Sequence, residues 1–181
     1  MKRVKNMLLV GATEKHAGKT TLTEKIIRKI KTSDTNLKLV AVKITILRDG
    51  KHSVSGYKIT DETKRDSVKD TARMLNAGAD KVLWLRCDEF NAEDGINKLL
   101  AQIPENSLIV CESNSARNYI DPGLFIMVRK NDEGKIKVTA QKVLNYPNIE
   151  VRTEMANNNV IYEPEVVEIL EASSKGWHLS L

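Results

Sequence analysis

The feature that most constrains the fold is an apolar run that leads through a polar, glycine-bearing loop into an amphipathic helix. Residues 7–10 are continuously apolar, as expected of a buried strand. After the loop, aliphatic side chains recur at helical spacing at Leu22, Ile26, Ile27 and Ile30. This order predicts a strand, a loop and a helix in direct succession.

The same alternation continues further along the chain. Strands are predicted at residues 39–46, 82–85, 108–111 and 124–128, helices at 67–79 and 92–102, and a turn at 121–123. Strands that are apolar on both faces and separated by helices are typical of a parallel sheet covered on both sides. The sequence therefore predicts a three-layer α/β/α fold with a mostly parallel sheet, built as one domain over residues 1–181.

The C-terminal part carries shorter patterns. They predict strands at residues 136–139, 149–151 and 160–162, and a last helix at 165–172 that begins after Pro164. Residues 49–65 are polar, with Gly50, Gly56 and several Ser, Thr and Lys, and predict a loop longer than most connections. Loops of that length are often functional.

The loop between the first strand and the first helix indicates a phosphate-binding loop. In such a loop, backbone N–H groups and a helix N-terminus surround the phosphates, a lysine spans the β- and γ-phosphates, and the next hydroxyl binds Mg²⁺. Lys19 is thus the candidate phosphate clamp and Thr20 the candidate metal ligand. The alternative is a glycine turn that merely begins a helix, with Lys19 in solvent. The candidate nucleotide-binding residues are Gly11, Thr13, Glu14, Lys15, His16, Ala17, Gly18, Lys19, Thr20 and Thr21.

This loop departs from the standard spacing at its start. Thr13 stands where the motif has glycine, and Gly11 lies two positions earlier. Lys15 and His16 are expected to project from the loop, either toward the γ-phosphate or a second substrate or simply into solvent.

Polar residues at strand ends are the next candidates, because ligands of open parallel sheets bind outside the carboxyl ends of the strands. Lys43 interrupts the second apolar strand and is a candidate cation for the γ-phosphate, or a lysine that snorkels from an edge. Glu112 follows an apolar run and is a candidate carboxylate for Mg²⁺ or for water, or a solvent-facing side chain. Asp70 is a candidate metal ligand, or the last residue of a capping box that begins at Ser67.

Together these residues make up the predicted site. Lys19, Lys43 and Glu112 are the catalytic candidates, and Thr20, Asp70 and Glu112 are the Mg²⁺ ligands. Lys43 could also form a basic pocket for a small anionic second substrate with cations of the 49–65 loop, which are Lys51, His52, Lys58, Lys64 and Arg65. Closure of that loop would exclude water from phosphoryl transfer.

The composition argues against two classes of binding partner, nucleic acids and membranes. The formal net charge is +5, but only 4% of residues are aromatic and no basic tract is interleaved with stacking side chains, so we expect no nucleic-acid partner. No apolar run approaches the roughly 18 residues of a membrane helix, and no signal peptide is recognisable, which predicts a cytoplasmic protein without a membrane partner. Cys87 and Cys111 each end an apolar segment, without metal-ligand spacing, and are predicted to be buried free thiols.

The chain resembles the molybdopterin-guanine dinucleotide biosynthesis protein B (MobB) family of P-loop NTPases over about its first 130 residues. The likeness rests on residues 18–22, on Val42-Lys43, on residues 69–73 followed by 77–79, and on residues 110–112. The resemblance implies a homodimer that binds GTP and Mg²⁺, hydrolyses slowly, and assists molybdenum cofactor biosynthesis together with a cofactor-biosynthesis protein. Ile44 and Ser113 stand where that family has His and Gly.

More distantly, the chain is similar to dethiobiotin synthetase, in Thr13-Glu14 ahead of residues 17–20 and in a lysine that ends the second strand. That likeness implies an ATP-dependent ligase acting on a small carboxylate or amine. A third alternative is a nucleotide-sensing module with little catalysis. The choice between ATP and GTP stays open. Residues 129–132 (Arg-Lys-Asn-Asp) match the guanine motif Asn-Lys-x-Asp except at the first residue, and a charged turn is the favoured explanation of this segment.

Overall fold

The computed structural model describes residues 1–34, 36–47, 56–131, 135–146, 149–156, 159–173 and 176–180. Within these residues, one sheet of eight strands has the order β3-β4-β2-β5-β1-β6-β7-β8. Its strands are β1 (Lys2–Ala12), β2 (Leu39–Leu47), β3 (Tyr57–Asp61), β4 (Lys81–Asp88), β5 (Leu108–Glu112), β6 (Ile120–Lys130), β7 (Ile149–Ala156) and β8 (Asn159–Glu163). Only β3 and β8, at the two edges, run antiparallel to their neighbours. The predicted mostly parallel sheet is confirmed.

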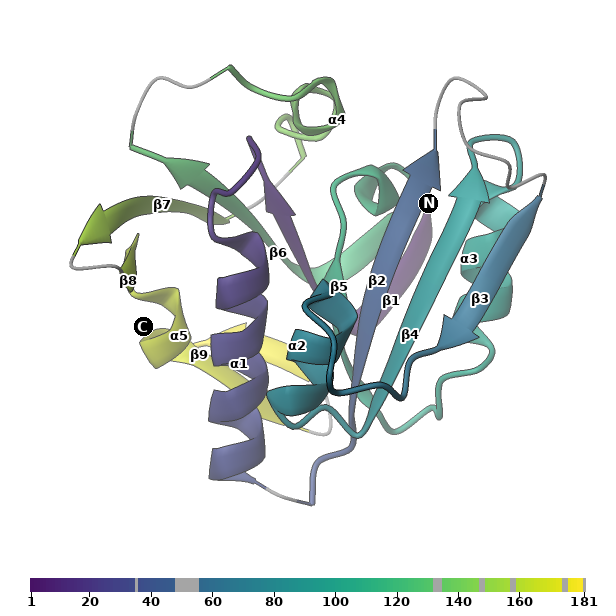
Figure 1. Cartoon of the computed structure of the whole chain (residues 1–181), viewed down its shortest axis with the longest axis horizontal. Coiled ribbons are helices and arrows are strands. Elements are labelled where there is room, and N and C mark those ends of the chain that lie inside the picture. The colour runs from purple at the N-terminus through teal and green to yellow at the C-terminus, as the bar shows by residue number, and fades with distance from the viewer. Residues whose placement is uncertain are drawn as a thin grey trace.

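Helices cover both faces of this sheet (Figure 1). They are α1 (Lys19–Ser33), α2 (Asp70–Asn76), α3 (Ala92–Leu100), α4 (Val138–Gln141) and α5 (Val166–Ile169), with a 3₁₀ turn η1 (Ser115–Asn118). Side chains of α1 and α2 belong to the buried cluster on one face, whereas side chains of α3 belong to the cluster on the other. This is the predicted three-layer α/β/α arrangement.

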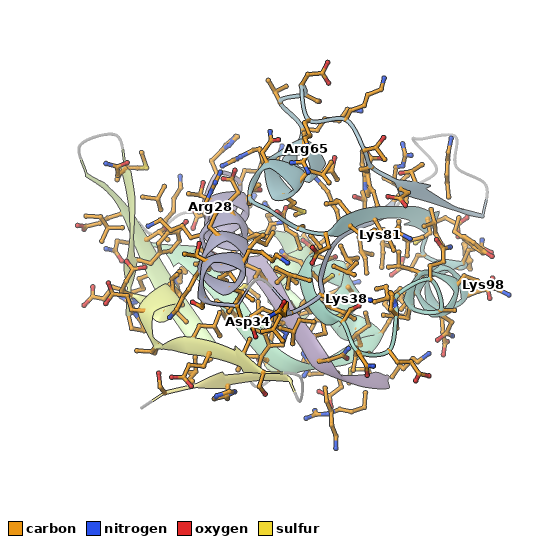
Figure 2. All side chains as sticks on the ribbon, turned by 90° about the horizontal axis from the view of Figure 1, so that it is seen from below. Arg28, Asp34, Lys38, Arg65, Lys81 and Lys98 are labelled. Carbon is orange, nitrogen blue, oxygen red and sulfur yellow. The ribbon has the colours of Figure 1, made fainter. Side chains whose placement is uncertain are left out.

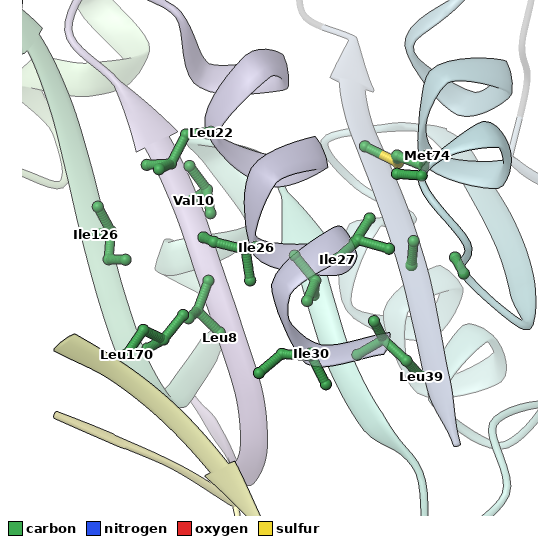
Figure 3. Close-up of a cluster of buried hydrophobic side chains, with 14 of the residues drawn as sticks. Leu8, Val10, Leu22, Ile26, Ile27, Ile30, Leu39, Met74, Ile126 and Leu170 are labelled. Carbon is green, nitrogen blue, oxygen red and sulfur yellow. The ribbon is translucent and has the colours of Figure 1, made fainter. Parts of the chain in front are cut away.

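The apolar stripe of α1 anchors the helix that follows the glycine-bearing loop. Ile26 and Ile27 are fully buried. Figure 3 shows Ile26 beside Leu8 and Val10 of β1, and Ile27 on the side of the helix where Leu39 and Met74 lie. Burial of one such side chain contributes about 1.5–3 kcal/mol. Figure 2 shows Arg28 of α1 and Lys98 of α3 pointing away from the sheet. The start of α1 is thereby fixed over the carboxyl end of β1.

Two of the C-terminal predictions are wrong. Residues 136–139 do not form a strand, because β1 and β7 already pair with the two edges of β6, and this segment instead turns into α4. The helix predicted at 165–172 is limited to α5, after which β9 (Leu170–Ser173) pairs with β10 (Gly176–Leu179). This hairpin forms because Leu170 and Trp177 are buried against the sheet, and the Trp177 indole donates to the carbonyl of Asn6 over 2.9 Å.

Three boundaries also differ from the prediction. Residues 57–61 of the predicted long loop form β3, since the open edge of β4 offers unpaired backbone groups. The predicted turn at 121–123 lies inside β6, where the register against β1 shifts between Val4 and Leu8. The second helix begins at Asp70 rather than at Ser67. The strands predicted at 149–151 and 160–162 are confirmed as parts of β7 and β8.

Two smaller predictions can also be compared with the described residues. Cys87 and Cys111 are buried and free, and burial raises the pKa of Cys87 to about 11. Among the helices within the described ranges, none has the length and apolar character needed to cross a bilayer.

Candidate functional site

The loop that joins β1 to α1 turns through two left-handed residues. His16 has φ 57° and Gly18, the N-cap of α1, has φ 86°. The carbonyl of Gly18 accepts the N–H of Leu22 over 2.9 Å and so begins the helix. Left-handed backbone lets successive N–H groups face one concavity, as anion-binding loops require.

Gly11 and Thr13 lie beneath this loop rather than on the wall of the pocket. A Cβ at Gly11 would stand 3.0 Å from Asn114 Oδ1 and 3.1 Å from Met127 Cε, so a side chain here would require these neighbours to shift. Thr13 is 1% exposed, and its N–H donates to the carbonyl of Val128 over 2.9 Å. Its backbone needs no left-handed conformation, which explains why threonine can replace glycine here.

Asn114, which the sequence analysis did not single out, fixes the end of β1. Its Oδ1 accepts the N–H of Ala12 and its Nδ2 donates to the carbonyl of Ala12, both over 2.8 Å. The side-chain amide thus imitates a neighbouring strand where β5 has already ended. The sequence signal that could have identified Asn114 is its position two residues after the candidate carboxylate Glu112, where the predicted strand ends.

The other predicted residues except Lys43 meet at one pocket of about 420 Å³ above the carboxyl ends of the strands. Its polar wall combines the loop and the first turn of α1 with side chains from three other segments. The lining residues are Glu14, Lys15, His16, Ala17, Gly18, Lys19, Thr20, Thr21, Asp70, Arg73, Glu112, Lys137 and Val160. Lys43 lines an adjoining pocket of about 270 Å³ that shares Lys19, Asp70 and Glu112 with the first.

Lys19 and Glu112 form an ion pair at the floor of this pocket. Lys19 Nζ donates to Glu112 Oε1 over 2.5 Å, and the Glu112 side chain is only 2% exposed. The second carboxylate oxygen, Oε2, is buried and has no hydrogen-bond partner among the described residues. A buried carboxylate oxygen without a partner is costly, so a cation or a water molecule at Oε2 would be stabilising.

Lys43 and Asp70 form a second ion pair beside the first. The ammonium of Lys43 donates to Asp70 Oδ2. Burial raises the pKa of the Asp70 carboxyl, but the hydrogen bond and charge of Lys43, the charge of Lys19 and a hydrogen bond from Thr20 together hold it below its ordinary value. Asp70 is therefore ionised and close to both candidate cations.

The capping-box alternative for Asp70 is not supported. Ser67 Oγ accepts the N–H of Lys69 over 3.2 Å, and the N-cap of α2 is Lys69, with no side-chain cap.

The three predicted Mg²⁺ ligands line the same pocket. Thr20 contacts Asp70, and Glu112 contributes its unpartnered oxygen. A hydroxyl and two carboxylates suit Mg²⁺, which takes oxygen ligands and keeps several waters. The residues therefore fit this ion. In the described ranges, no cluster of three or more His, Cys, Asp and Glu side chains exists that would hold a metal without help from a substrate.

Lys137, Arg73 and Tyr162 also reach the site, although sequence reasoning gave them no role there. Burial, together with the positive charges of Lys19 and Lys15, lowers the pKa of Lys137. Arg73 donates to Thr21 Oγ1 over 3.2 Å and to Glu24.

Tyr162 lies behind the loop rather than in it. Its hydroxyl donates to the carbonyl of Gly18 over 2.9 Å. Thr153 likewise donates to the carbonyl of Ala17 over 3.2 Å. Both contacts join strands near the C-terminus to the loop, a relation that local patterns do not encode.

A third pocket of about 250 Å³ adjoins the first and shares His16, Ala17 and Val160 with it. It lies past the carboxyl ends of β6 and β7, and its remaining lining residues are Lys130, Asn131, Thr153, Glu154 and Met155. Asn131 Nδ2 lies 3.4 Å from Glu154 Oε2.

The predicted basic pocket of the 49–65 loop is only partly brought together. Lys51 and His52 lie outside the described residues. Arg65 lies over α2 (Figure 2), where its guanidinium donates to the carbonyl of Leu75 over 2.6 Å. Lys58 lies on β3 opposite Arg86 of β4, and Lys64 is exposed.

Comparison with known proteins yields no match to this chain among protein-family models, curated proteins or solved structures.

Proposed function

We propose that the protein binds a nucleoside triphosphate with Mg²⁺ at the larger pocket and hydrolyses it slowly. The observation that carries this proposal is the meeting of Lys19, Thr20, Asp70 and Glu112 around the first turn of α1. The exposed N–H groups of a helix start attract phosphate, and the N-terminal end of the helix carries partial positive charge. Lysine supplies the phosphate clamp, and the oxygen side chains suit the metal.

Each residue has a distinct task in this proposal. Lys19 exchanges Glu112 for the β- and γ-phosphates, and Thr20 and Asp70 would hold Mg²⁺, which neutralises charge on the transferred phosphoryl group. Glu112 then orients the attacking water through its buried carboxylate. Lys137 adds positive charge at this pocket, and Lys43 lines the adjoining pocket that shares Lys19, Asp70 and Glu112 with it. Positioning and charge neutralisation are what phosphoryl transfer needs from a protein.

The base is assigned to the adjoining pocket of about 250 Å³. Met155 and Val160 supply apolar surface for a purine, and Glu154 supplies a carboxylate at its edge. A carboxylate can only accept hydrogen bonds, so it complements the N1–H and N2–H₂ donors of guanine rather than the edge of adenine. We therefore favour GTP over ATP.

Calorimetric titration of the wild-type protein with GTP and with ATP, with and without Mg²⁺, tests this function. Lys19→Met is the test variant, and Lys98→Met, a lysine on the far side of the sheet, is its control. Saturable GTP binding that Lys19→Met abolishes and Lys98→Met preserves is expected. Equal affinities in wild type and Lys19→Met, with unchanged circular dichroism, would refute the proposal.

A further inference from the structure

A second group of cations surrounds the ring of Trp84 on β4. Arg86 Cζ lies 4.2 Å from the ring centroid, Lys43 Nζ 5.6 Å and Lys69 Nζ 6.0 Å. Lys58 lies directly opposite Arg86 in the antiparallel pairing of β3 with β4, and so on the same face. We call Lys58, Lys69, Trp84 and Arg86 the Trp84 cluster. Lys43 lies between it and the proposed nucleotide site.

Three carboxylates on neighbouring segments have partners inside the protein. Asp70 pairs with Lys43. Glu62 accepts hydrogen bonds from Thr60 over 2.7 Å and Thr71 over 3.3 Å. Asp88 accepts them from Asn91 and from the N–H of Gly56, all over 2.9 Å.

The cations of the Trp84 cluster have no such partners. Within the described residues, the side chains of Lys58, Lys69 and Arg86 make neither a hydrogen bond nor an ion pair. Arg86 Nε is buried as well, and has no acceptor. These three cations are therefore unpaired within the part of the chain that the structure describes, and they can pair with an anion from solution.

The ring and the guanidinium are also held in place. The Trp84 indole donates to Thr45 Oγ1 over 3.1 Å, which fixes the orientation of the ring on which Arg86 stacks. A guanidinium stacked on an aromatic ring keeps its planar fork of N–H donors free for a carboxylate or a phosphate. Little conformational entropy is then lost when an oxyanion binds.

We propose that the Trp84 cluster binds a small organic polyanion, bearing carboxylate or phosphate groups, as the second substrate of the nucleotide site. This inference rests on the proposed function, because Lys43 connects the two sites. Lys43 is neutralised by Asp70, and Asp70 is a proposed Mg²⁺ ligand. When Mg²⁺ and the nucleotide engage Asp70, Lys43 is released toward the Trp84 ring, so the nucleotide and the anion bind with positive cooperativity.

Indole N–H signals in a ¹H–¹⁵N spectrum test this inference. Trp177, 7% exposed and bonded to Asn6, serves as an internal reference for Trp84. We expect citrate or glucose 6-phosphate, titrated at constant ionic strength, to move the Trp84 signal saturably while that of Trp177 stays fixed. The anion that acts at lower concentration identifies the preferred oxyanion.

Two variants and one control make the assignment specific. Arg86→Gln is expected to weaken the response at least tenfold, and Lys58→Gln with Lys69→Gln, both exposed, to weaken it without a folding risk. Arg28→Gln, an exposed arginine of α1, should change nothing. Absence of a saturable response to either anion, or an unchanged response in Arg86→Gln, would overturn the proposal. So would a response to oligothymidylate alone, which would assign the cluster to a polynucleotide.

The same anion titrations, repeated with Mg²⁺ and GTP, separate this inference from the proposed function. Mg²⁺ and GTP are expected to tighten anion binding severalfold in the wild type and not in Lys19→Met. If the anion responses survive but Lys19→Met still binds GTP normally, the proposed function fails and the anion site stands. If GTP binding is lost in Lys19→Met but no anion moves the Trp84 signal, the anion site fails and the proposed function stands.

Discussion

Lys43 Nζ and the Asp70 carboxylate form an ion pair that joins the middle of β2 to the first residue of α2. The prediction that this lysine ends the second strand is wrong, because β2 continues to Leu47 in register with β4. Beside this ion pair, Lys19 and Glu112 join the start of α1 to the end of β5. Lys19 and Lys43 are therefore each held by a proposed metal or water ligand. Binding of Mg²⁺ and nucleotide must exchange these partners, so the two ligands are expected to depend on each other.

Asp70→Asn tests the first pair through the pH dependence of stability. The folded-state pKa of Asp70 lies below its unfolded value, so its contribution is present above about pH 4 and is lost as the pH falls through the lower, folded-state pKa. The variant should lose about 1 kcal/mol or less at neutral pH, since the pair is partly exposed. Its stability should also fall less steeply on acidification, which urea unfolding between neutral and acidic pH measures.

The same variant tests the metal assignment. Mg²⁺-dependent GTP hydrolysis should fall strongly in Asp70→Asn, while metal-free nucleotide binding stays close to that of the wild type. Hydrolysis that keeps its wild-type dependence on Mg²⁺ concentration would remove Asp70 from the metal site.

Removal of Lys19 is expected to affect folding as well as binding. Lys19→Ala leaves the buried carboxylate of Glu112 without its cation, which costs about 1–3 kcal/mol. Glu112→Gln should relieve most of that loss in the double variant, because the buried group is then neutral. Thermal unfolding of the four proteins of this double-mutant cycle measures the coupling. Additive losses would show that the pair contributes nothing.

Gly18 and His16 offer a matched comparison of the two left-handed positions. Gly18→Ala places a Cβ 3.0 Å from Val160 Cγ1 at φ 86°, and should cost at least about 1–2 kcal/mol and weaken phosphate binding. His16→Gly relieves strain at φ 57° and should change stability by about 0.5 kcal/mol or less. Chemical denaturation and GTP titration of both variants decide this. Equal effects would mean that the loop conformation is not what the pocket requires.

The lowered pKa of Lys137 predicts that triphosphate binding weakens at alkaline pH. This pKa is lowered from the ordinary 10.5, chiefly by burial, so Lys137 loses its charge at a lower pH than a solvated lysine. GTP affinity should therefore decline on the alkaline side in the wild type and show a flatter profile in Lys137→Gln, which should bind more weakly at neutral pH. Titrations across the alkaline range provide the comparison, with Lys98→Gln as the control.

Glu154 predicts the choice of base. Glu154→Gln replaces a carboxylate by an amide, so the ratio of GTP to ATP affinity should drop by about tenfold. Competition of the two nucleotides for the variant and the wild type measures this ratio. An unchanged ratio would place base recognition elsewhere.

The sequence predicted those parts of the fold whose signals are local. The apolar run before Gly11, the stripe that includes Ile26 and the carboxylate Glu112 after β5 are all read from consecutive residues, and they lie where expected. The misses have a common cause. Whether a short apolar segment becomes a strand depends on which sheet edges are open, so β3 formed and residues 136–139 did not.

The residues missed at the site have a related cause. Lys137 reaches the pocket because its N–H donates to the carbonyl of Thr13 over 2.8 Å, and Tyr162 lies behind the loop because of the position of β8 in the sheet. Neither relation is encoded by a local pattern.

The contact of Tyr162 with the Gly18 carbonyl has a consequence for how the protein is made. The loop lies early in the sequence, and a ribosome releases it long before β7 and β8, which supply Thr153 and Tyr162 behind it. A nascent chain with only the first five strands therefore has the motif without its rear support. We therefore expect nucleotide to bind only after most of the chain has been translated. Nucleotide would then bind to complete, folded molecules and would not assist the folding of the nascent chain.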